Sequence, residues 1–378
     1  MNRSASAPAR KLLFFVTEDY YFVSHRLPLA QAALAAGYEV SVVTRVRQSG
    51  DPIRRAGIRL IAFENARSSL NPFAELRTLW RLIGVYRRER PDLVHHVAMK
   101  PVLYGTIAAR LAGRPSIVNA VAGMGWLFTS GAGLAKWLKP AVRWALRHVL
   151  SAGVALVQNP DDARLLAKFG VPDSRIRRVP GSGVDLRLFQ PYPVPRGCPV
   201  VVLPARLLWD KGVGEFVTAA RLLRQRGVVA RFVLAGEPDP LNPATITDEQ
   251  VARWVGEGVV EYRGWVADMP ALLASSHVVC LPSYREGLPK VLIEAAAAGR
   301  PIVTTDVPGC REVVRDGDNG LLVRAGDAEA LADALARLIE KPELRQRMGV
   351  RGRVLAEQEF GLDAVVEQTL AVYREATA

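Results

Sequence analysis

The chain has 378 residues, of which 49% are hydrophobic and 7% aromatic, with a formal net charge of +13. This length fits two domains of about 100–200 residues, and no apolar segment reaches the roughly 18 residues of a membrane span, which argues against a bilayer-spanning protein. The widely spaced Cys198, Cys280 and Cys310 make neither a disulfide framework nor a zinc knuckle, so a reducing cytoplasm is expected.

Short apolar runs alternate with helical patterns along the first half of the chain. The expected strands are 11–17, 38–45, 92–98, 115–122 and 153–159, and the expected helices are 27–37, 104–113 and 161–170. Strand and helix in alternation predict a parallel sheet with helices on both faces.

The first half is also strongly basic. Residues 1–190 hold 28 Lys/Arg against 12 Asp/Glu, a net charge of +16, whereas residues 191–378 hold 22 against 25, a net charge of −3. From Leu93 through Pro160 there is no Asp or Glu. One half therefore faces an anionic partner, for which anionic lipid, a phosphorylated acceptor and nucleic acid are the candidates.

The alternation begins again after a proline-rich segment. Phe189 to Pro199 holds four prolines, which suit an extended linker, so we place the domain boundary after residue 190. The strands expected beyond it are 198–207, 231–237, 277–283, 301–306 and 320–325, with helices at 214–227 and 330–340. The sequence thus predicts an α/β protein of two doubly wound units, 1–190 and 191–361, with an amphipathic stretch at 362–378 that is able to pack back on the first unit.

Two glutamates bracket the start of one helix in the second half. In SYREGLPKVLIEAAAAG, Glu286 precedes Pro289, a favoured first helical residue, and Glu294 lies about five residues inside the helix, roughly 7–8 Å along its axis. The free N–H groups and positive dipole end of a helix bind phosphate. The pattern predicts a diphosphate beside Gly287, Leu288 and Pro289, between two carboxylates that accept hydrogen bonds from sugar and ribose hydroxyls.

This segment resembles the retaining glycosyltransferases of the GT-B fold, in the large family with a glutamate, seven residues and a second glutamate, here Glu286 and Glu294. In PARLLWDKG, Arg206 and Lys211 match the basic pair that holds the donor diphosphate in that family. The resemblance implies two Rossmann-like domains facing each other across a cleft, the second binding the donor. It implies Glu286, Arg206 and Lys211 as catalytic residues, because two cations neutralise the charge growing on the leaving nucleoside diphosphate.

The resemblance also implies further donor contacts. In YRGWV, main-chain atoms near Val266 would bind the nucleobase, and Trp265 belongs either to this site or to the core. Family members usually need no metal, and the RDGDNG segment with Asp316 and Asp318 is typical of a turn before a strand. We expect a nucleotide sugar as co-substrate and neither metal nor cofactor.

The N-terminal half resembles a subgroup that builds lipid-linked oligosaccharides, in which the donor is UDP-linked and the acceptor is a sugar on a polyprenyl diphosphate. The matching segments are EDYYFVSHRLPLAQAALAAGYEVSVVT, HHVAMKPVLYGTIAA, AGMGWLF and PGSGVDLRLF. On this resemblance the first domain binds the acceptor, with His25, Arg26 and Lys100 as ligands of its phosphates or sugars. Gly123 and Gly125 would let the backbone approach the reacting sugar.

Many relatives have a histidine near the AGMGW strand end, where this chain has alanine and glycine, so no imidazole base can be assigned. The leaving phosphate would then take the acceptor proton on the same face of the sugar, and Glu286 would position the sugar rather than attack it. A two-carboxylate scheme with an acid and a nucleophile is the competing mechanism.

Residues 134–149 predict a helix with the character of a membrane-surface segment. At about 100° per residue, one side gathers Trp137, Leu138, Ala141, Trp144, Ala145 and Val149, and the opposite side gathers Lys136, Lys139, Arg143 and Arg147. Tryptophan with basic residues is typical of an interfacial helix, although a packed helix with a solvated basic face has the same pattern. We expect a cytoplasmic enzyme, peripheral on the inner face of the cell membrane.

The favoured function is transfer of an N-acetylhexosamine or hexose from a nucleotide sugar to a polyprenyl-diphosphate-linked saccharide, in cell-surface polysaccharide or glycan biosynthesis. Two alternatives keep an enzyme: a glycosyltransferase with a soluble acceptor, and a sugar-nucleotide epimerase on the same fold. A nucleic-acid-binding module is disfavoured, because no recognition helix or aromatic stacking motif accompanies the basic charge.

Overall fold

The computed structural model describes residues 9–64, 72–113, 115–121 and 143–378, which fall into two compact units. Unit 1 comprises Met1–Ser182 and Val366–Ala378, and unit 2 comprises Gly183–Val365. The proline-rich segment, where we placed the boundary, lies inside unit 2. Its carbonyl groups accept hydrogen bonds from that unit, Pro195 from His277 at 3.0 Å and Phe189 from Arg353 at 2.6 Å.

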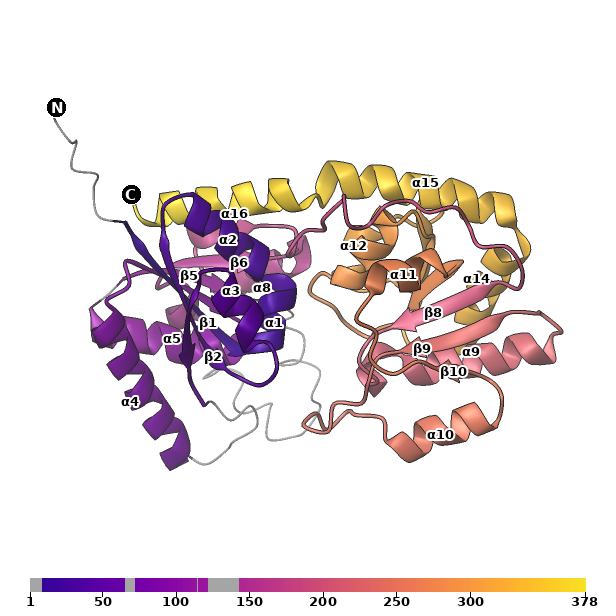
Figure 1. Cartoon of the computed structure of the whole chain (residues 1–378), viewed down its shortest axis with the longest axis horizontal. Coiled ribbons are helices and arrows are strands. Elements are labelled where there is room, and N and C mark those ends of the chain that lie inside the picture. The colour runs from indigo at the N-terminus through magenta and orange to yellow at the C-terminus, as the bar shows by residue number, and fades with distance from the viewer. Residues whose placement is uncertain (1–8, 65–71, 114, 122–142) are drawn as a thin grey trace. The chain divides into compact units, whose positions relative to one another are not determined.

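The sheet of unit 1 is parallel throughout its described strands. Their order is β3-β2-β1-β4-β5-β6-β7 (Figure 1). The bounds are β1 Lys11–Glu18, β2 Glu39–Arg45, β3 Arg59–Ala62, β4 Leu93–Val97, β5 Ser116–Ala120, β6 Val154–Val157 and β7 Ile176–Arg178. The central strands are buried along most of their length because helices cover both of their faces.

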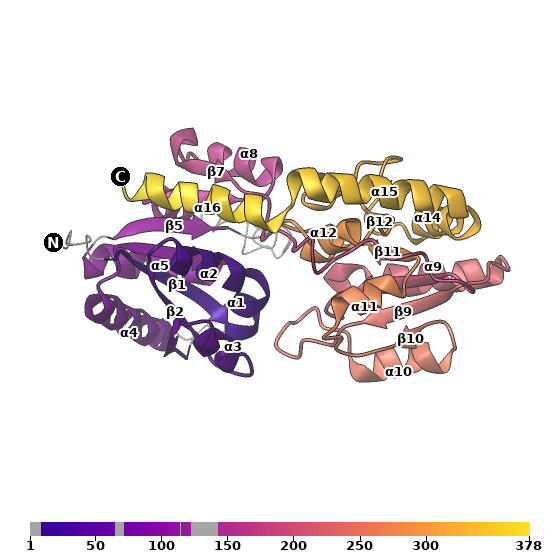
Figure 2. The same ribbon diagram turned by 45° about the horizontal axis from the view of Figure 1, so that its top comes forward.

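The helices of unit 1 are α1 Asp19–His25, α2 Leu27–Ala35, α3 Gly50–Arg55, α4 Pro72–Glu89, α5 Met99–Ala112, α8 Pro160–Lys168 and, from Val366 on, α16 Leu362–Ala376, with a 3₁₀ turn at Asp173–Arg175. Helices α4 and α5 cover one face, where Leu82 and Tyr86 of α4 and Ala108 of α5 pack on Leu13 and Phe15 of β1. Figure 2 shows α16 on the other side of the same sheet.

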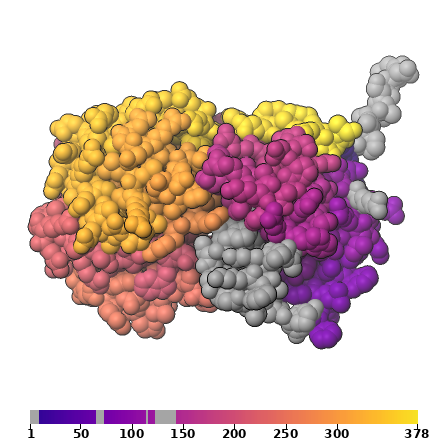
Figure 3. Space-filling view, turned by 180° about the vertical axis from the view of Figure 1, so that it is seen from behind, coloured from indigo at the N-terminus to yellow at the C-terminus, as the bar shows by residue number. Residues whose placement is uncertain are grey.

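Helix α16 is held to unit 1 by polar contacts as well as by packing. The hydroxyl of Tyr373 lies 2.5 Å from Nδ1 of the buried His95 on β4. Arg177 forms an ion pair with Glu375, and Figure 3 shows α16 at the surface of this unit beside the segment that contains α8. Burial, followed by the nearby charges of Arg26 and His96, lowers the pKa of His95 well below its ordinary value.

The sheet of unit 2 is also parallel, in the order β10-β9-β8-β11-β12-β13 over the described strands. The strands are β8 Val200–Pro204, β9 Arg231–Ala235, β10 Glu261–Tyr262, β11 Val278–Leu281, β12 Ile302–Thr305 and β13 Gly320–Val323. Alternate residues serve different cores: Val201 and Leu203 pack under α9 and α14, whereas Val202 packs under α12.

The helices of unit 2 are α9 Val213–Gln225, α10 Asp248–Gly256, α11 Met269–Ala274, α12 Lys290–Ala297, α13 Cys310–Val313, α14 Ala328–Glu340 and α15 Pro342–Glu359, with a 3₁₀ turn at Trp209–Lys211. The alanine run of α12 allows α15 to approach closely, since a Cβ on Gly352 would lie 3.4 Å from Cα of Ala296. The two doubly wound units confirm the predicted α/β class, which is that of GT-B proteins.

Candidate active site

The site of unit 2 lies where the strand order reverses. From β8 the chain continues to β9 and β10 on one side, and then crosses to β11, β12 and β13 on the other. The carboxyl ends of β8 and β11 are therefore neighbours whose following loops run apart, which is where open parallel sheets bind ligands. The loops that leave these two strands, 205–212 and 282–289, carry the residues predicted to be catalytic.

Lys211 and Glu286 come together from these two loops. Nζ of Lys211 lies 2.5 Å from Oε1 of Glu286, and the same oxygen accepts a hydrogen bond of 2.8 Å from Oγ of Ser283. Both side chains of the ion pair are largely shielded, with 21% and 12% exposed. A partly shielded ammonium group attracts an anion more strongly than an exposed one. The sequence missed Ser283, whose only signal is its place at the end of β11.

Gly212 is what allows the two loops to meet. It has φ of +71°, and a Cβ there would lie 2.1 Å from the carbonyl oxygen of Pro282. The main chain also links the loops directly, because N–H of Tyr284 donates to the carbonyl of Asp210 at 3.0 Å. The neighbouring Tyr284 hydroxyl donates to Glu215 at 2.6 Å, which with burial raises the pKa of Tyr284 to about 12.

Arg206 is not part of this ion pair. Its Nη1 lies 2.6 Å from Oδ2 of Asp239, in the loop that follows β9, and its side chain is partly exposed. The sequence did not single out Asp239. The two predicted cations thus leave the same strand end but have different carboxylate partners, and each would have to exchange or share that partner to bind a phosphate.

Helix α12 begins one residue later than predicted. Pro289 is the N-cap, with ψ of 111°, and its carbonyl accepts from N–H of Leu292 at 3.0 Å. Its extended conformation continues the loop of Gly287 and Leu288, which Gly309 touches so closely that a Cβ would lie 2.5 Å from the carbonyl oxygen of Gly287. The first N–H groups of the helix still point toward the end that carries Glu286.

Glu294 is buried on the first turns of α12, and its carboxylate lies 3.0 Å from Nζ of Lys290. Burial raises the pKa of Glu294, and the charge and hydrogen bond of Lys290 oppose that rise. A carboxylate kept there at the expense of desolvation is typical of a residue retained for binding.

Replacing Glu294 with glutamine is expected to stabilise the fold while weakening donor binding. A raised folded-state pKa means that the fold favours the neutral carboxyl. Glu294 therefore lowers the free energy of unfolding least below about pH 4.5, its ordinary pKa, where it is protonated in both states, and most at neutral pH. We expect Glu294→Gln to raise the melting temperature at pH 7 by about 3 °C, corresponding to about 1 kcal/mol, with a gap that closes toward pH 4.5. The affinity for a nucleotide sugar, the expected co-substrate, should fall about 10-fold. Thermal melts and calorimetric titration measure both; an unchanged affinity would make Glu294 a structural residue.

The loop after β10 carries the residues predicted for the nucleobase. N–H of Gly236 donates to the carbonyl of Gly264 at 2.7 Å, and Val266 packs on the core under α12. Trp265 is 71% exposed, so the alternative that it belongs to the core is wrong.

The candidate acceptor residues lie at the corresponding reversal of unit 1, between β1 and β4. His25 stacks on Tyr21 at 4.1 Å, and its Nδ1 lies 2.7 Å from Oγ of Ser24. Arg26 is only 6% exposed, and its Nε finds no acceptor among the described residues. Lys100 forms an ion pair of 3.0 Å with Glu75. Gly123 and Gly125 lie outside the described residues.

A strained residue at this edge was missed. Ala98, between β4 and α5, has φ of 76° and ψ of 163°. This conformation is costly for any residue but glycine and accumulates at functional sites. Ala98 is the N-cap of α5, whose first turn carries Lys100.

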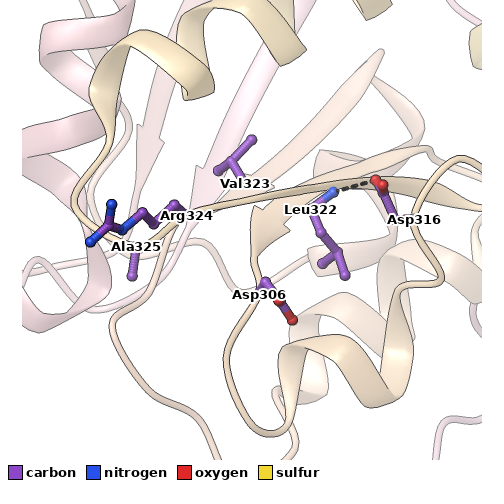
Figure 4. Close-up of a pocket in the computed structure, with 6 residues that line it drawn as sticks. All are labelled: Asp306, Asp316, Leu322, Val323, Arg324 and Ala325. Atoms are coloured by element: carbon purple, nitrogen blue, oxygen red, sulfur yellow. Dashed lines mark hydrogen bonds between the residues drawn. The ribbon is translucent and has the colours of Figure 1, made fainter.

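A hollow of about 500 Å³ lies along β13 and the end of β12 (Figure 4). Its acidic groups already have partners: Asp306 is 2.8 Å from Nε of Arg311, and Asp316 accepts from N–H of Leu322 at 2.9 Å. Asp318, in the turn predicted from RDGDNG, is paired with Arg351 at 2.9 Å.

The predicted interfacial helix lies partly outside the described residues, which begin again at 143. There Trp144 is 64% exposed, Arg143 and Arg147 are exposed as well, and Val149 is buried. At these positions the core of unit 1 takes Leu146 and Val149, and the tryptophan is left outside it. No helix in the described ranges is long and apolar enough to cross a membrane.

Two doubly wound parallel-sheet units, with a cation–carboxylate pair at the strand reversal of the second, have the architecture of GT-B proteins. Comparison with known families agrees: residues 198–341 match the family described as glycosyl transferases group 1, and residues 11–151 match glycosyl transferase 4-like. The chain therefore belongs to the glycosyltransferase family that these two matches describe, group 1 in its second half and 4-like in its first.

The relatives differ in their acceptors. The chain is 28% identical to the N,N'-diacetylbacillosaminyl-diphospho-undecaprenol alpha-1,3-N-acetylgalactosaminyltransferase of Campylobacter jejuni, over 86% of this chain and 88% of that protein. It is 31% identical to the D-inositol 3-phosphate glycosyltransferase of an Arthrobacter strain, over 92% and 88%. The structure of Anabaena HepE in complex with UDP-glucose superposes with a TM-score of 0.76 at 18% identity, covering 97% of this chain and 99% of that one.

Proposed function

We propose that this protein is a retaining glycosyltransferase that moves an N-acetylhexosamine or hexose from a UDP-sugar to a saccharide linked to polyprenyl diphosphate, in the synthesis of a cell-surface polysaccharide or glycan. The observation that carries the proposal is the Lys211–Glu286 pair, 2.5 Å apart at the strand reversal of unit 2 and beside the start of α12. The lipid-linked acceptor of the Campylobacter relative supports the acceptor class, and the UDP-glucose complex of HepE supports the donor class.

In the proposed reaction the donor diphosphate lies beside the N–H groups of Gly287 and Leu288 and the start of α12, with the base near Val266. Lys211 and Arg206 neutralise the charge that grows as the bond between the anomeric carbon and the diphosphate oxygen breaks. The new bond forms to an acceptor hydroxyl oxygen on the same face, and its proton passes to the leaving phosphate oxygen. Glu286 positions the sugar.

Unit 1 supplies the acceptor side in this proposal. His25 and Lys100 lie after β1 and β4, and Lys100 has its carboxylate partner Glu75 within 3.0 Å, which an acceptor diphosphate would replace. The resemblance alone assigns Gly123 and Gly125, which lie outside the described residues, to this side. Arg26, only 6% exposed, acts from beneath the acceptor site. The protein is peripheral on the inner face of the cell membrane, and the reaction needs no divalent metal.

The test is a panel of UDP-sugars offered with polyprenyl-diphosphate saccharides, with the product anomer read by NMR and EDTA added in one arm. We expect one UDP-sugar to be consumed only when the lipid-linked acceptor is present, an α-linked product from the α-linked donor, and an unchanged rate in EDTA. Inversion of the anomer, or turnover of nucleotide sugar without any acceptor as in an epimerase, would overturn the proposal.

A soluble acceptor is the second candidate, because the Arthrobacter relative, at 31% identity, is named for inositol 3-phosphate. Both acceptors are anionic, so the charge of unit 1 does not separate them. Transfer to inositol phosphates, with none to the lipid-linked saccharides in the same panel, would favour this candidate.

A further inference from the structure

Helix α4 (Pro72–Glu89) has two apolar sides. The inner side packs in the core of unit 1 through Leu82, Ile83, Val85 and Tyr86, with Leu79 partly buried beside them. The outer side carries Phe73, Leu76 and Trp80, which are 82%, 53% and 59% exposed. A surface helix normally places polar residues opposite its core face. Here three large apolar side chains stand in that position.

The three apolar residues form one ridge. Their spacing of three and then four residues places them on one side of the helix, over a length of roughly 10 Å. Figures 1 and 2 both show α4 on the outside of unit 1, with its length exposed along one side. We call Phe73, Leu76 and Trp80, together with Arg77 and Arg81, the α4 surface.

Arginines flank the ridge. Arg77 and Arg81 follow Leu76 and Trp80 by one residue each, and neither forms an ion pair with any residue that the structure describes. Arg81 instead lies over the ring of Phe63, 5.5 Å from its centroid. Further along the same helix, Arg87 and Arg88 are exposed as well. Of the two acidic residues of α4, Glu75 turns inward to Lys100, and Glu89, at the end of the helix, is paired with Arg59 and Arg88.

Aromatic and aliphatic side chains between arginines match the boundary of an anionic bilayer, where the apolar groups enter the acyl region and the guanidinium groups remain at the phosphates. A second protein or a second copy of this chain would meet unpaired arginines at the contact, and unit 1 as a whole repels another copy of itself through its charge.

We propose that the α4 surface docks the protein on an anionic lipid bilayer. The inference deepens the proposed function, since an acceptor on a polyprenyl chain is confined to a membrane, and it names the side of unit 1 that meets the lipid. Docking raises the local concentration of enzyme near the acceptor without altering the donor site in unit 2.

Sedimentation with vesicles of phosphatidylcholine and phosphatidylglycerol (7:3) tests this directly. The wild type should bind these vesicles, and bind less in 0.5 M NaCl. The double variant Leu76→Glu with Trp80→Glu should lower the partition coefficient at least 10-fold, and Arg77→Gln with Arg81→Gln should remove most of the salt-sensitive part. The matched control is Val350→Glu, which changes an apolar residue 60% exposed on α15 of unit 2 and should bind as the wild type does.

Activity assays separate this inference from the proposed function. On a water-soluble acceptor with a shortened lipid chain, the α4 variants should keep the wild-type rate, which also shows that they are folded. On the same saccharide in vesicles, their rate should fall in proportion to binding. Vesicle binding equal to the wild type in the Leu76/Trp80 variant would overturn the docking surface, as would sedimentation equilibrium showing a dimer that this variant dissociates. Loss of transfer in both acceptor formats by the wild type, with vesicle binding intact, would instead overturn the proposed function alone.

Discussion

Replacing Lys211 with alanine is expected to lower kcat/KM for sugar transfer by about 100- to 1,000-fold, the usual effect of removing one preorganised group that stabilises developing charge. The side chain is 21% exposed and 2.5 Å from Glu286, so the alanine removes a cation from a partly shielded position where its field is strong. Most of the loss should appear in kcat rather than in KM, because the diphosphate carries its greatest charge as it leaves.

The control for this prediction is another ion pair of the same length in the same unit. Arg226 and Asp333 lie 2.5 Å apart on the exposed surface, and Arg226→Ala should change kcat/KM by less than about twofold, as exposed pairs contribute little. Melting temperatures of both variants show whether the fold is intact. A Lys211→Ala enzyme with normal kcat would contradict the assignment of Lys211 to the leaving group.

Gly212→Ala is expected to destabilise unit 2 by about 2–4 kcal/mol and to reduce activity with it. The residue has a left-handed conformation, which costs an alanine about 1–2 kcal/mol, and the added Cβ would lie 2.1 Å from the carbonyl oxygen of Pro282, which is backbone and cannot rotate away. The β8 and β11 loops would have to separate, and the contact between Lys211 and Glu286 would lengthen.

Gly227→Ala distinguishes strain from collision. Gly227 has a nearly identical φ of +76°, but a Cβ there would meet nothing within 4 Å. Its substitution should cost only about 1–2 kcal/mol, with full activity per folded molecule. Denaturant unfolding and initial rates, measured on both variants, test this difference. Equal losses of stability would mean that the close approach of the β8 and β11 loops at Gly212 adds nothing to the cost of the substitution.

The strands could be predicted closely. Continuous apolar runs such as those of β1 and β8 were placed within a few residues of their observed bounds, because a strand covered on both faces is apolar throughout. The start of α12 was predicted one residue too early, at Pro289. Proline is compatible with both the N-cap and the first helical position, and only the loop geometry distinguishes the two. The sequence did not show which apolar residues between 143 and 149 the core takes: Leu146 and Val149 are buried, whereas Trp144 is exposed.

By itself, the sequence determined the α/β class, the two repeated units and the charged residues of the candidate site, because these depend on local periodicity and on the spacing of charged groups along one loop and helix. Only the tertiary structure decided which carboxylate each of these cations pairs with. The strand order brings Lys211 to Glu286, 75 residues away in the sequence, whereas Arg206 pairs with Asp239. It also turned one side of α4 inward and left Phe73, Leu76 and Trp80 outside. The physical reason is that periodicity shows which residues share a face, whereas contacts between distant loops and the choice of the buried face depend on which strands pair.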